Sequence, residues 1–366
     1  MRHTYDLIVI GGGLTGGAIA WGAAREGASV VMLDEGDVAY RAAVGNFGLV
    51  WVQGRGHLDP PFAHWTRRSA DLWPDLAGAV AETTGVDVAL RMPGGFIFCT
   101  SDDEFEERTN AVRRMHNESG ETTTTMVDRE RLHAIIPGLG DQVVGASFCP
   151  TDGHISPLAL TRALHETTGA KGLTYKPGHK VDAIDAAPHD FTVHSGTARF
   201  TAPRVVIAAG LGCRELAPMI GMSVPVEPLQ GQVIVTERVP HFLDYSTHIC
   251  RQTDDGTVLL GDSQEDAGFS LMTKVSTLAD IAARNLLVFP ALKDASVLRT
   301  WAALRVMPPD GLPIYDQSDR YPGAFAMASH SGVTLAAAHA LVLAPAILRG
   351  HLPEELGIFS ARRFDT

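Results

Sequence analysis

One stretch near the amino terminus, Tyr5 to Gly36, restricts the fold more than any other part of the chain. It begins with the apolar run Leu7 to Ile10, which is too short for a helix and rich in β-branched residues, as in a buried parallel strand. Glycines at G-x-G-x-x-G spacing follow, then small helix-forming residues, and then a second strand that ends at Asp34. This order predicts the first unit of a doubly wound, dinucleotide-binding fold.

The three glycines of the turn, Gly11, Gly13 and Gly16, each meet a separate requirement. Gly11 allows the tight turn out of the strand, Gly13 lets the backbone approach a pyrophosphate, and Gly16 lets the helix pack closely against the strand. The first helical turn, which includes Leu14 and Thr15, presents N–H groups and a partial positive charge to the phosphates. The alternative, a glycine-rich turn without a ligand, leaves the acid at the end of the second strand unexplained.

That acid, Asp34, indicates which dinucleotide binds. It stands about 20 residues after the glycine turn, where a carboxylate can accept a hydrogen bond from a ribose 2′-OH. A carboxylate opposes the 2′-phosphate of NADP, so NADP is disfavoured. The neighbouring Glu35 and Gly36 belong to the same predicted cofactor site.

Composition excludes several other classes of protein. The 366 residues are 45% hydrophobic and 20% charged, which supports a large core and predicts two domains. The net charge of −12, without a basic run, argues against nucleic acid or an anionic membrane surface as a partner. No stretch approaches the ~18–20 apolar residues of a membrane span, so none is predicted.

The four cysteines also bear on location and on metals. Cys99, Cys149, Cys213 and Cys250 are widely spaced and form no C-x-x-C pair, which argues against an iron–sulfur cluster or a structural zinc. They are typical of reduced, mostly buried thiols, and we therefore expect a cytoplasmic protein without a bound metal.

The segment Tyr40 to Gly56 is rich in glycine yet strongly apolar. A loop of this kind usually lies against something flat or is buried. One interpretation places Phe47 against a flavin ring, with Asn46 and Gly48 as hydrogen-bond donors near its polar edge. The alternative is a packed connection without a ligand.

Later segments extend the same architecture. Residues 202–212 predict a buried strand whose glycine-containing turn, at Ala209 and Gly210, approaches the dinucleotide. The hairpin from His248 to Gly261 predicts antiparallel strands that wall one side of a flat ring. Residues 325–348 predict a last buried strand and a long apolar helix, whose amino end can face an anion or the electron-rich edge of a flavin.

Together these segments resemble the D-amino-acid oxidase and glycine oxidase superfamily of FAD enzymes over nearly the whole chain. The motifs, in order, are GGGLTGG, TDGHISPLAL, VVIAAGLG, PLQGQVIVTE, WAALRVMPPDGLPIY and ASHSGVTLAAAHAL. The resemblance implies a two-domain α/β (α+β) fold of the glutathione-reductase type, in which a Rossmann-like FAD-binding domain is interleaved with an antiparallel-sheet substrate domain. The FAD-binding domain would comprise residues 1–90, 145–215 and 306–366, and the substrate-binding domain residues 91–144 and 216–305.

The resemblance also assigns residues. In that family the WAxLR segment places an arginine over the flavin to hold the substrate carboxylate, and this arginine corresponds to Arg305. The H-S-G-V-T-L turn supplies backbone amides to the flavin, which implies the residues Gly332, Val333 and Thr334. Val181 is a candidate adenine contact. The chain lacks the cysteine and the histidine that tether flavin in some relatives, so the resemblance implies non-covalent FAD.

Within the superfamily, the segment GNFGLVWVQGRG is most similar to the small FAD subunits of bacterial multi-subunit dehydrogenases, which act on opines, hydroxyproline or proline. This implies partner subunits and leaves open an FMN at a subunit contact. Three functions are therefore considered: a catalytic FAD subunit of an amino-acid or opine dehydrogenase, a self-sufficient oxidase that releases hydrogen peroxide, and a non-catalytic electron-relay subunit.

Three side chains are candidates for the chemistry, each with an alternative. Arg305 can grip a carboxylate bidentately, or it can pair with Asp310. His248 lies where relatives carry a residue that faces the substrate, or it has a structural role. Arg251 can bind a second carboxylate, as an opine would have, or form an interface ion pair. His154, in a turn, is expected to be structural.

Overall fold

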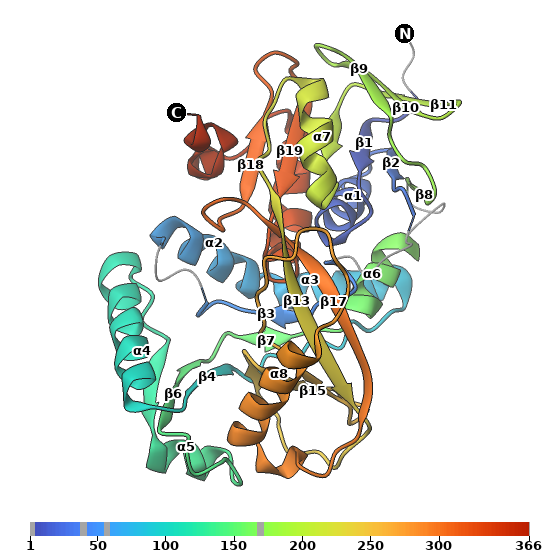
Figure 1. Ribbon diagram of the computed structural model, residues 1–366. Coiled ribbons are helices and arrows are strands. Elements are labelled where there is room, and N and C mark those ends of the chain that lie inside the picture. Colours follow the sequence, from blue (N-terminus) through green and yellow to red (C-terminus); the bar gives the residue numbers. More distant parts are fainter. Residues whose placement is uncertain (1–3, 37–41, 55–58, 167–171, 366) are drawn as a thin grey trace.

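The computed structural model describes residues 4–36, 42–54, 59–166 and 172–365. Figure 1 shows an upper part, which holds both ends of the chain, and a lower part built from mostly antiparallel strands and the helices around them. Two long paired strands, β13 (Glu227–Thr236) and β17 (Val297–Met307), run between the two parts.

The upper part is built on a six-stranded sheet with the order β18-β19-β12-β1-β2-β8. All neighbours are parallel except β18 and β19. The strands are β1 (Leu7–Ile10), β2 (Val30–Leu33), β8 (Leu173–Lys176), β12 (Val205–Ile207), β18 (Ile314–Gln317) and β19 (Ala324–Ala328). Helix α1 (Leu14–Arg25) connects β1 to β2, which confirms the predicted strand–turn–helix–strand unit.

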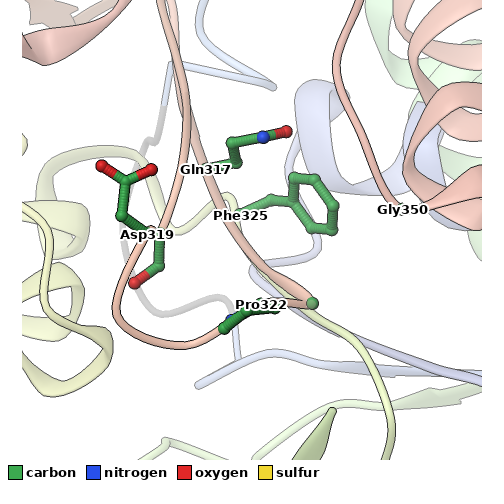
Figure 2. A pocket seen from close by; sticks show the side chains of 7 residues that line it. Gln317, Asp319, Pro322, Phe325 and Gly350 are labelled. Carbon is green, nitrogen blue, oxygen red and sulfur yellow. The ribbon is translucent and has the colours of Figure 1, made fainter. Parts of the chain in front are cut away.

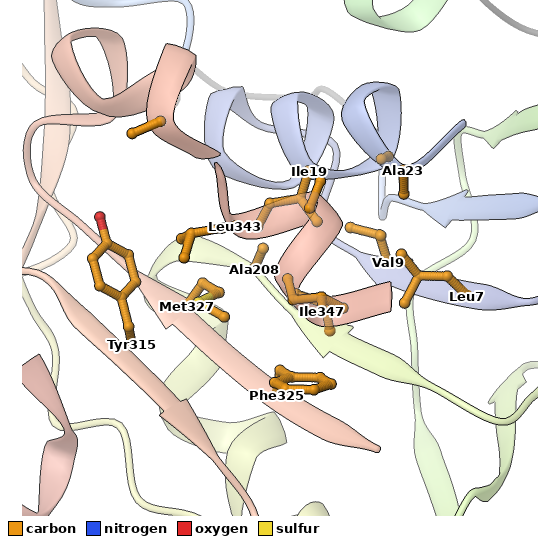
Figure 3. Close-up of a cluster of buried hydrophobic side chains, with 14 of the residues drawn as sticks. Leu7, Val9, Ile19, Ala23, Ala208, Tyr315, Phe325, Met327, Leu343 and Ile347 are labelled. Atoms are coloured by element: carbon orange, nitrogen blue, oxygen red, sulfur yellow. The ribbon is translucent and has the colours of Figure 1, made fainter. Parts of the chain in front are cut away.

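Alternate residues of this sheet face two different cores. Figure 3 shows one of them, in which Val9, Phe325 and Met327 pack against α1 and the carboxy-terminal helices. Those helices are α9 (Gly332–Ala338), the π-helical turn η5 (His339–Leu343) and α10 (Ala344–Arg349). The other face packs against the antiparallel sheet of β9 (Ala183–Ala187), β10 (Asp190–Ser195) and β11 (Ala198–Ala202) and against α7 (Cys213–Leu216).

The lower part contains two four-stranded sheets. One has the order β15-β16-β13-β17, with β15 (Cys250–Gln252) and β16 (Val258–Leu260) forming the predicted hairpin. The other has the order β14-β4-β6-β5. Its strands are β4 (Gly95–Cys99), β5 (Thr125–Asp128), β6 (Gly145–Cys149) and β14 (Ser246–Thr247). This mixed arrangement confirms the predicted α/β flavoprotein fold.

The remaining elements surround these sheets. The helices are α2 (Pro60–Asp71), α3 (Trp73–Thr84), α4 (Asp102–Arg114), α5 (Arg129–Ile135), α6 (Pro157–Glu166) and α8 (Val275–Val288). Short helical turns are η1 (Met115–Ser119), η2 (Gly210–Gly212), η3 (Ala217–Ile220), η4 (Pro290–Leu292), η6 (Glu354–Phe359) and η7 (Ala361–Phe364). A two-stranded ladder pairs β3 (Leu49–Val50) with β7 (Gly153–His154).

The division into two domains stays a prediction. One strand pairs differently from the predicted boundaries, because β6 begins the segment 145–215 but is hydrogen-bonded to β4 and β5 of the segment 91–144.

The carboxy-terminal helix corrects the expectation that no stretch of the chain is long and apolar enough to span a membrane. Gly332–Arg349 is 18 residues long with a mean hydropathy of 1.6, enough to span a membrane by length and composition alone. However, 67% of it is buried, as in the core helix of a globular protein.

Candidate functional site

The glycine turn after β1 is shaped by close contacts between backbone atoms. Gly11 has φ +106°, and a Cβ there would collide with the carbonyl oxygen of Ala208. A Cβ at Gly16 would collide with the carbonyl oxygen of Gly11. Gly13 differs, because the nearest atom to its would-be Cβ is the Cβ of Ala43 at 3.9 Å. Gly11 and Gly16 therefore serve the fold, whereas Gly13 leaves room for a close ligand.

Two helix amino termini meet beside this turn. A Cβ at Gly332, the first residue of α9, would lie 3.8 Å from Leu14 Cβ and 3.9 Å from Thr15 Oγ1, in the first turn of α1. Neither helix has a side-chain cap or an acid in its first turn, whereas α2, α4 and α5 are capped by side chains. The first-turn N–H groups of α1 and α9 therefore face a common space as donors. We call the glycine turn with these two helix starts the nucleotide crease.

Asp34 closes one side of the nucleotide crease. It is 8% exposed, and its carboxylate accepts hydrogen bonds from Gly12 N at 2.7 Å and Gly36 N at 2.9 Å. Gly210 has φ +60°, and its would-be Cβ lies 3.4 Å from Val306 Cγ2, so the predicted turn at Ala209 and Gly210 reaches the end of β17.

Two other predicted cofactor residues differ in burial, and their roles stay predictions. The side chain of Glu35 is exposed, and that of Val181 packs in the core on the β9–β11 side of the sheet. The Oγ1 of Thr334 accepts from Trp51 N at 3.0 Å and contacts Leu49 O at 3.3 Å, so only its backbone N–H is available to a ligand.

The loop before β3 is held together by its own side chains. Asn46 Nδ2 donates to Ala42 O at 2.7 Å and to Ala43 O at 3.0 Å, and its Oδ1 accepts from Gly48 N at 2.7 Å. Asn46 Nδ2 and Gly48 N, the donors that the flavin interpretation requires, thus form hydrogen bonds within the loop. These bonds favour the alternative, a packed connection without a ligand. Phe47 lies directly against Gly261. Residues 40, 41, 55 and 56 of the predicted segment lie outside the described residues.

One face of the sheet β15-β16-β13-β17 carries both candidate arginines. Side chains alternate along a strand, and the register pairs Arg305 with Leu229 and Arg251 with Leu259. Ile234, Cys250 and Leu260 point the other way, into the hydrophobic core of the lower part. The other residues on the same face as these two arginines are Leu229, Gly231, Val233, Val235, Leu259, Arg299, Trp301 and Ala303. We call it the arginine face.

Arg305 lies directly over Gly231. A Cβ at Gly231 would be 2.5 Å from Arg305 Nη1 and 2.7 Å from Cζ, so the guanidinium occupies the space that the missing side chain leaves. Arg305 Nη1 also donates to Gln230 O at 3.2 Å. Asp310, the alternative partner, instead binds Arg363 Nε at 2.7 Å.

Arg251 lies far along the same face. Leu229 of β13 is paired with Arg305, and Val235 of β13 is level with Arg251 because both are paired with Leu259. The two arginine backbones are therefore roughly 20 Å apart along β13. Arg251 is 6% exposed and donates from Nη1 to Ile155 O at 2.8 Å, and its Nε has no hydrogen-bond partner among the described residues. Burial lowers its pKa to about 10.

The two histidines lie in different surroundings, with His154 buried and His248 half-buried. His248 Nε2 lies 3.2 Å from Arg284 Nη2 of α8, on the core side of the sheet rather than on the arginine face. Burial lowers the pKa of His248 to about 4, although the nearby Asp262 opposes this shift. These contacts fit its structural alternative. His154 Nδ1 lies 2.9 Å from Ser246 Oγ, and burial, with a smaller contribution from Arg251, lowers its pKa to about 3.

Sequence reasoning missed three residues of the site. His165 of α6 binds the carbonyl of Gly12, Gly231 makes room for Arg305, and Ser329 has a buried Oγ without a partner among the described residues. Gly231 and Ser329 left a signal, since they sit in the recognised motifs PLQGQVIVTE and ASHSGVTLAAAHAL. His165 lies on another helix, and no spacing rule connects it to the turn.

A separate pocket, seen from close by in Figure 2, lies at the other end of the parallel sheet. It is lined by Gln317, Ser318, Asp319, Pro322, Gly323, Phe325 and Gly350. Pro322 and Gly323 precede β19, so this pocket is at the amino end of that strand, whereas dinucleotides bind at the carboxyl ends. We do not assign it to the candidate site.

The residues of the nucleotide crease fit FAD. The first-turn N–H groups of two uncapped helices suit anionic and electron-rich groups, the open space at Gly13 admits a close ligand, and Asp34 suits a ribose. One buried polar atom beside the crease, Ser329 Oγ, has no partner among the described residues, as expected where a polar ligand binds.

Comparison with known proteins agrees with this geometry. The chain is 43% identical over 369 residues to the opine oxidase B subunit of Rhizobium meliloti, covering 99% of this chain and 98% of the relative. It is 41% identical over 364 residues to the opine oxidase B subunit of Agrobacterium tumefaciens strain Ach5, with 99% and 98% covered. The fold matches the crystal structure of glycine oxidase from Geobacillus kaustophilus with a TM-score of 0.90 at 22% identity, over 98% of each chain. Residues 6–346 match the model of the FAD dependent oxidoreductase family, DAO, and the chain belongs to this family.

Proposed function

We propose that the protein is the catalytic FAD subunit of a multi-subunit dehydrogenase, and that it oxidises the C–N bond beside a carboxylate in an opine, an imino acid or an amino acid. The observation that carries this proposal is Arg305 resting over Gly231 on the arginine face, close to Val306, which borders the turn at Gly210. The similarity to the B subunits of two opine oxidases supports both the substrate class and the existence of partner subunits.

The roles of the residues follow from their positions. Leu14, Thr15, Gly16 and the start of α9 hold the cofactor through backbone N–H groups, and Asp34 binds its ribose. FAD, when bound, supplies the hydride acceptor. Arg305 binds the substrate carboxylate through two parallel N–H donors and so fixes the α-carbon relative to the cofactor.

This reaction depends more on how the substrate is positioned than on acid–base catalysis. A substrate whose amine is already neutral loses hydride from its α-carbon, and water then hydrolyses the imine product. The low pKa of His248, about 4, means that its imidazole is neutral at pH 7. For His248 we therefore propose the structural alternative rather than the catalytic role. A second-carboxylate role for Arg251, an FMN at a subunit contact and a cytoplasmic location are part of the proposal.

The test is anaerobic mixing of the purified protein with opines, imino acids and D-amino acids while flavin absorbance is followed. With Arg305→Ala we expect kcat/KM for flavin reduction to fall about 100- to 1000-fold, the scale expected for removing one partner of a buried charged hydrogen bond. Arg214→Ala is the matched control, since Arg214 is exposed and pairs with Glu227. Unchanged bleaching of Arg305→Ala would remove Arg305 from catalysis.

A self-sufficient oxidase is the second candidate, supported by the 25% identity over 373 residues to the glycine oxidase of Geobacillus kaustophilus. The isolated protein would then release hydrogen peroxide in air. The multi-subunit proposal instead requires other chains to co-purify with the native protein. A non-catalytic relay subunit would show no flavin reduction by any substrate in the screen.

A further inference from the structure

His165 contacts the glycine turn from outside the dinucleotide-binding motif. It lies on α6, and its Nε2 is 2.7 Å from the carbonyl oxygen of Gly12. A carbonyl only accepts, so Nε2 carries the hydrogen and donates. The imidazole also stacks on Tyr175 of β8, with ring centroids 4.1 Å apart and an interplanar angle of 21°. Tyr175 itself approaches Gly12, because its Cε2 lies 3.1 Å from the would-be Cβ.

Gly12 is therefore held on both sides of its Cα. Its N–H donates to Asp34 Oδ2 at 2.7 Å, and its carbonyl accepts from His165. The two side chains belong to the loop after β2 and to α6, so separate elements fix the two peptide planes of one residue. A glycine turn without such restraints has more backbone freedom than any other sequence.

The direction of the Gly12 carbonyl matters for binding an anion. In a trans peptide the C=O of one residue and the N–H of the next point in opposite directions. His165 holds the Gly12 carbonyl on its own side, and the Gly13 N–H must then point away from His165. Without that donor the peptide plane could rotate and present a partially negative oxygen to the phosphates.

We propose that His165 is a positioning residue for FAD: its donated hydrogen bond, with the ring oriented by Tyr175, preorganises the Gly12–Gly13 peptide for the pyrophosphate. This inference depends on the FAD binding described above and adds a determinant that lies outside the glycine motif. The effect should be on cofactor affinity, because His165 reaches the turn rather than the arginine face.

The test compares His165→Gln with His165→Glu. The two side chains have the same size and His165 is half-buried, but glutamine keeps a donor near the Nε2 position whereas ionised glutamate can only accept. The rate of FAD release from the purified holoenzyme is followed by the rise in flavin fluorescence on dilution. We expect His165→Glu to release FAD about 5- to 10-fold faster than wild type, as for the loss of one hydrogen bond, and His165→Gln to stay within about twofold.

Equal release rates for Gln and Glu would overturn the inference, because they would show that the imidazole matters only for packing. If the glutamate variant does not fold, His165→Phe replaces it: phenylalanine keeps the stack on Tyr175 and lacks the donor, and the same acceleration relative to His165→Gln is expected. A wild-type protein that holds no FAD at all would contradict the proposed function instead, so the two failures can be told apart.

Discussion

The nucleotide crease and the arginine face are built by different means. In the crease, glycines and backbone N–H groups from α1 and α9 form the site, and close contacts between backbone atoms fix its shape. On the arginine face, long side chains on paired strands form the site, and strand register fixes their positions. An added methyl group in the crease should therefore change the fold or cofactor binding, whereas on the arginine face it should change substrate binding by moving the guanidinium of Arg305.

The largest expected effect separates two glycines within the crease. Gly16→Ala places a methyl group against the Gly11 carbonyl, so we expect it to destabilise the fold by about 1–3 kcal/mol or more and to abolish FAD retention. Gly13→Ala meets only open space, so the apoprotein should keep its melting temperature while FAD affinity falls. Flavin content and thermal unfolding of both variants measure this. Loss of apoprotein stability in Gly13→Ala would contradict the assignment of its space to a ligand.

The second prediction applies the same change to the arginine face. Gly231→Ala puts a methyl group 2.5 Å from Arg305 Nη1, which forces the guanidinium to move. We expect kcat/KM for flavin reduction to fall about 10- to 100-fold, mainly through KM, because a displaced carboxylate anchor weakens substrate binding. FAD content should not change. Gly78→Ala, in a helix with open space around it, is the matched control.

A third prediction concerns the β3–β7 ladder, which lies between the two regions. His154 is buried with its pKa lowered from 6.5 to about 3, so the folded state keeps it neutral while the unfolded state takes up a proton below about pH 6.5. Its contribution to stability is full above pH 6.5 and declines as the pH falls towards 3. Between pH 6.5 and pH 5, the free energy of unfolding therefore falls by about 2 kcal/mol because of this one histidine.

Thermal unfolding from pH 5 to 8 measures this contribution. His154→Asn keeps a hydrogen-bonding group near Ser246 but cannot titrate, so its melting temperature should depend less on pH than that of wild type. His351→Asn, at an exposed position, controls for the removal of a histidine. An identical acid slope in wild type and His154→Asn would show that other groups dominate.

The smallest expected effect is at Ser329, where β19 ends beside the crease. Its Oγ is buried without a partner among the described residues, and an unsatisfied buried hydroxyl destabilises a protein. Ser329→Ala should therefore leave the apoprotein equally or more stable. If the hydroxyl binds FAD, the dissociation constant should rise about two- to fivefold. A destabilised apoprotein with unchanged FAD affinity would assign Ser329 to the fold alone.

The crease was predictable because its determinants are local. The strand, the glycines, the first turn of α1 and Asp34 lie within one short segment, and each has a fixed relation to the next. The resemblance to the D-amino-acid oxidase superfamily supplied Arg305 and the start of α9. Neither source could supply Gly231 as the support of Arg305, because that contact depends on the pairing of β13 with β17.

Other parts of the site could not be predicted from the sequence for similar reasons. His165 reaches Gly12 only because α6 packs against α1 in three dimensions. The hydrogen bonds of Asn46 go to the backbone of its own loop, which composition does not reveal. His248 and Arg251 are near neighbours in the sequence, yet they contact different elements, because His248 lies in the bend before β15 and reaches Arg284 of α8, whereas Arg251 lies on β15 and reaches Ile155.

The pairing of the α1 and α9 amino termini has a consequence for biosynthesis. Thr15 and Gly332 come from opposite ends of the polypeptide but border the same space. A nascent chain still attached to the ribosome has the first helix long before the second, so it presents only half of the coenzyme's anchoring groups. Flavin loading should therefore wait until α9 has been synthesised, and products truncated before α9 should be colourless.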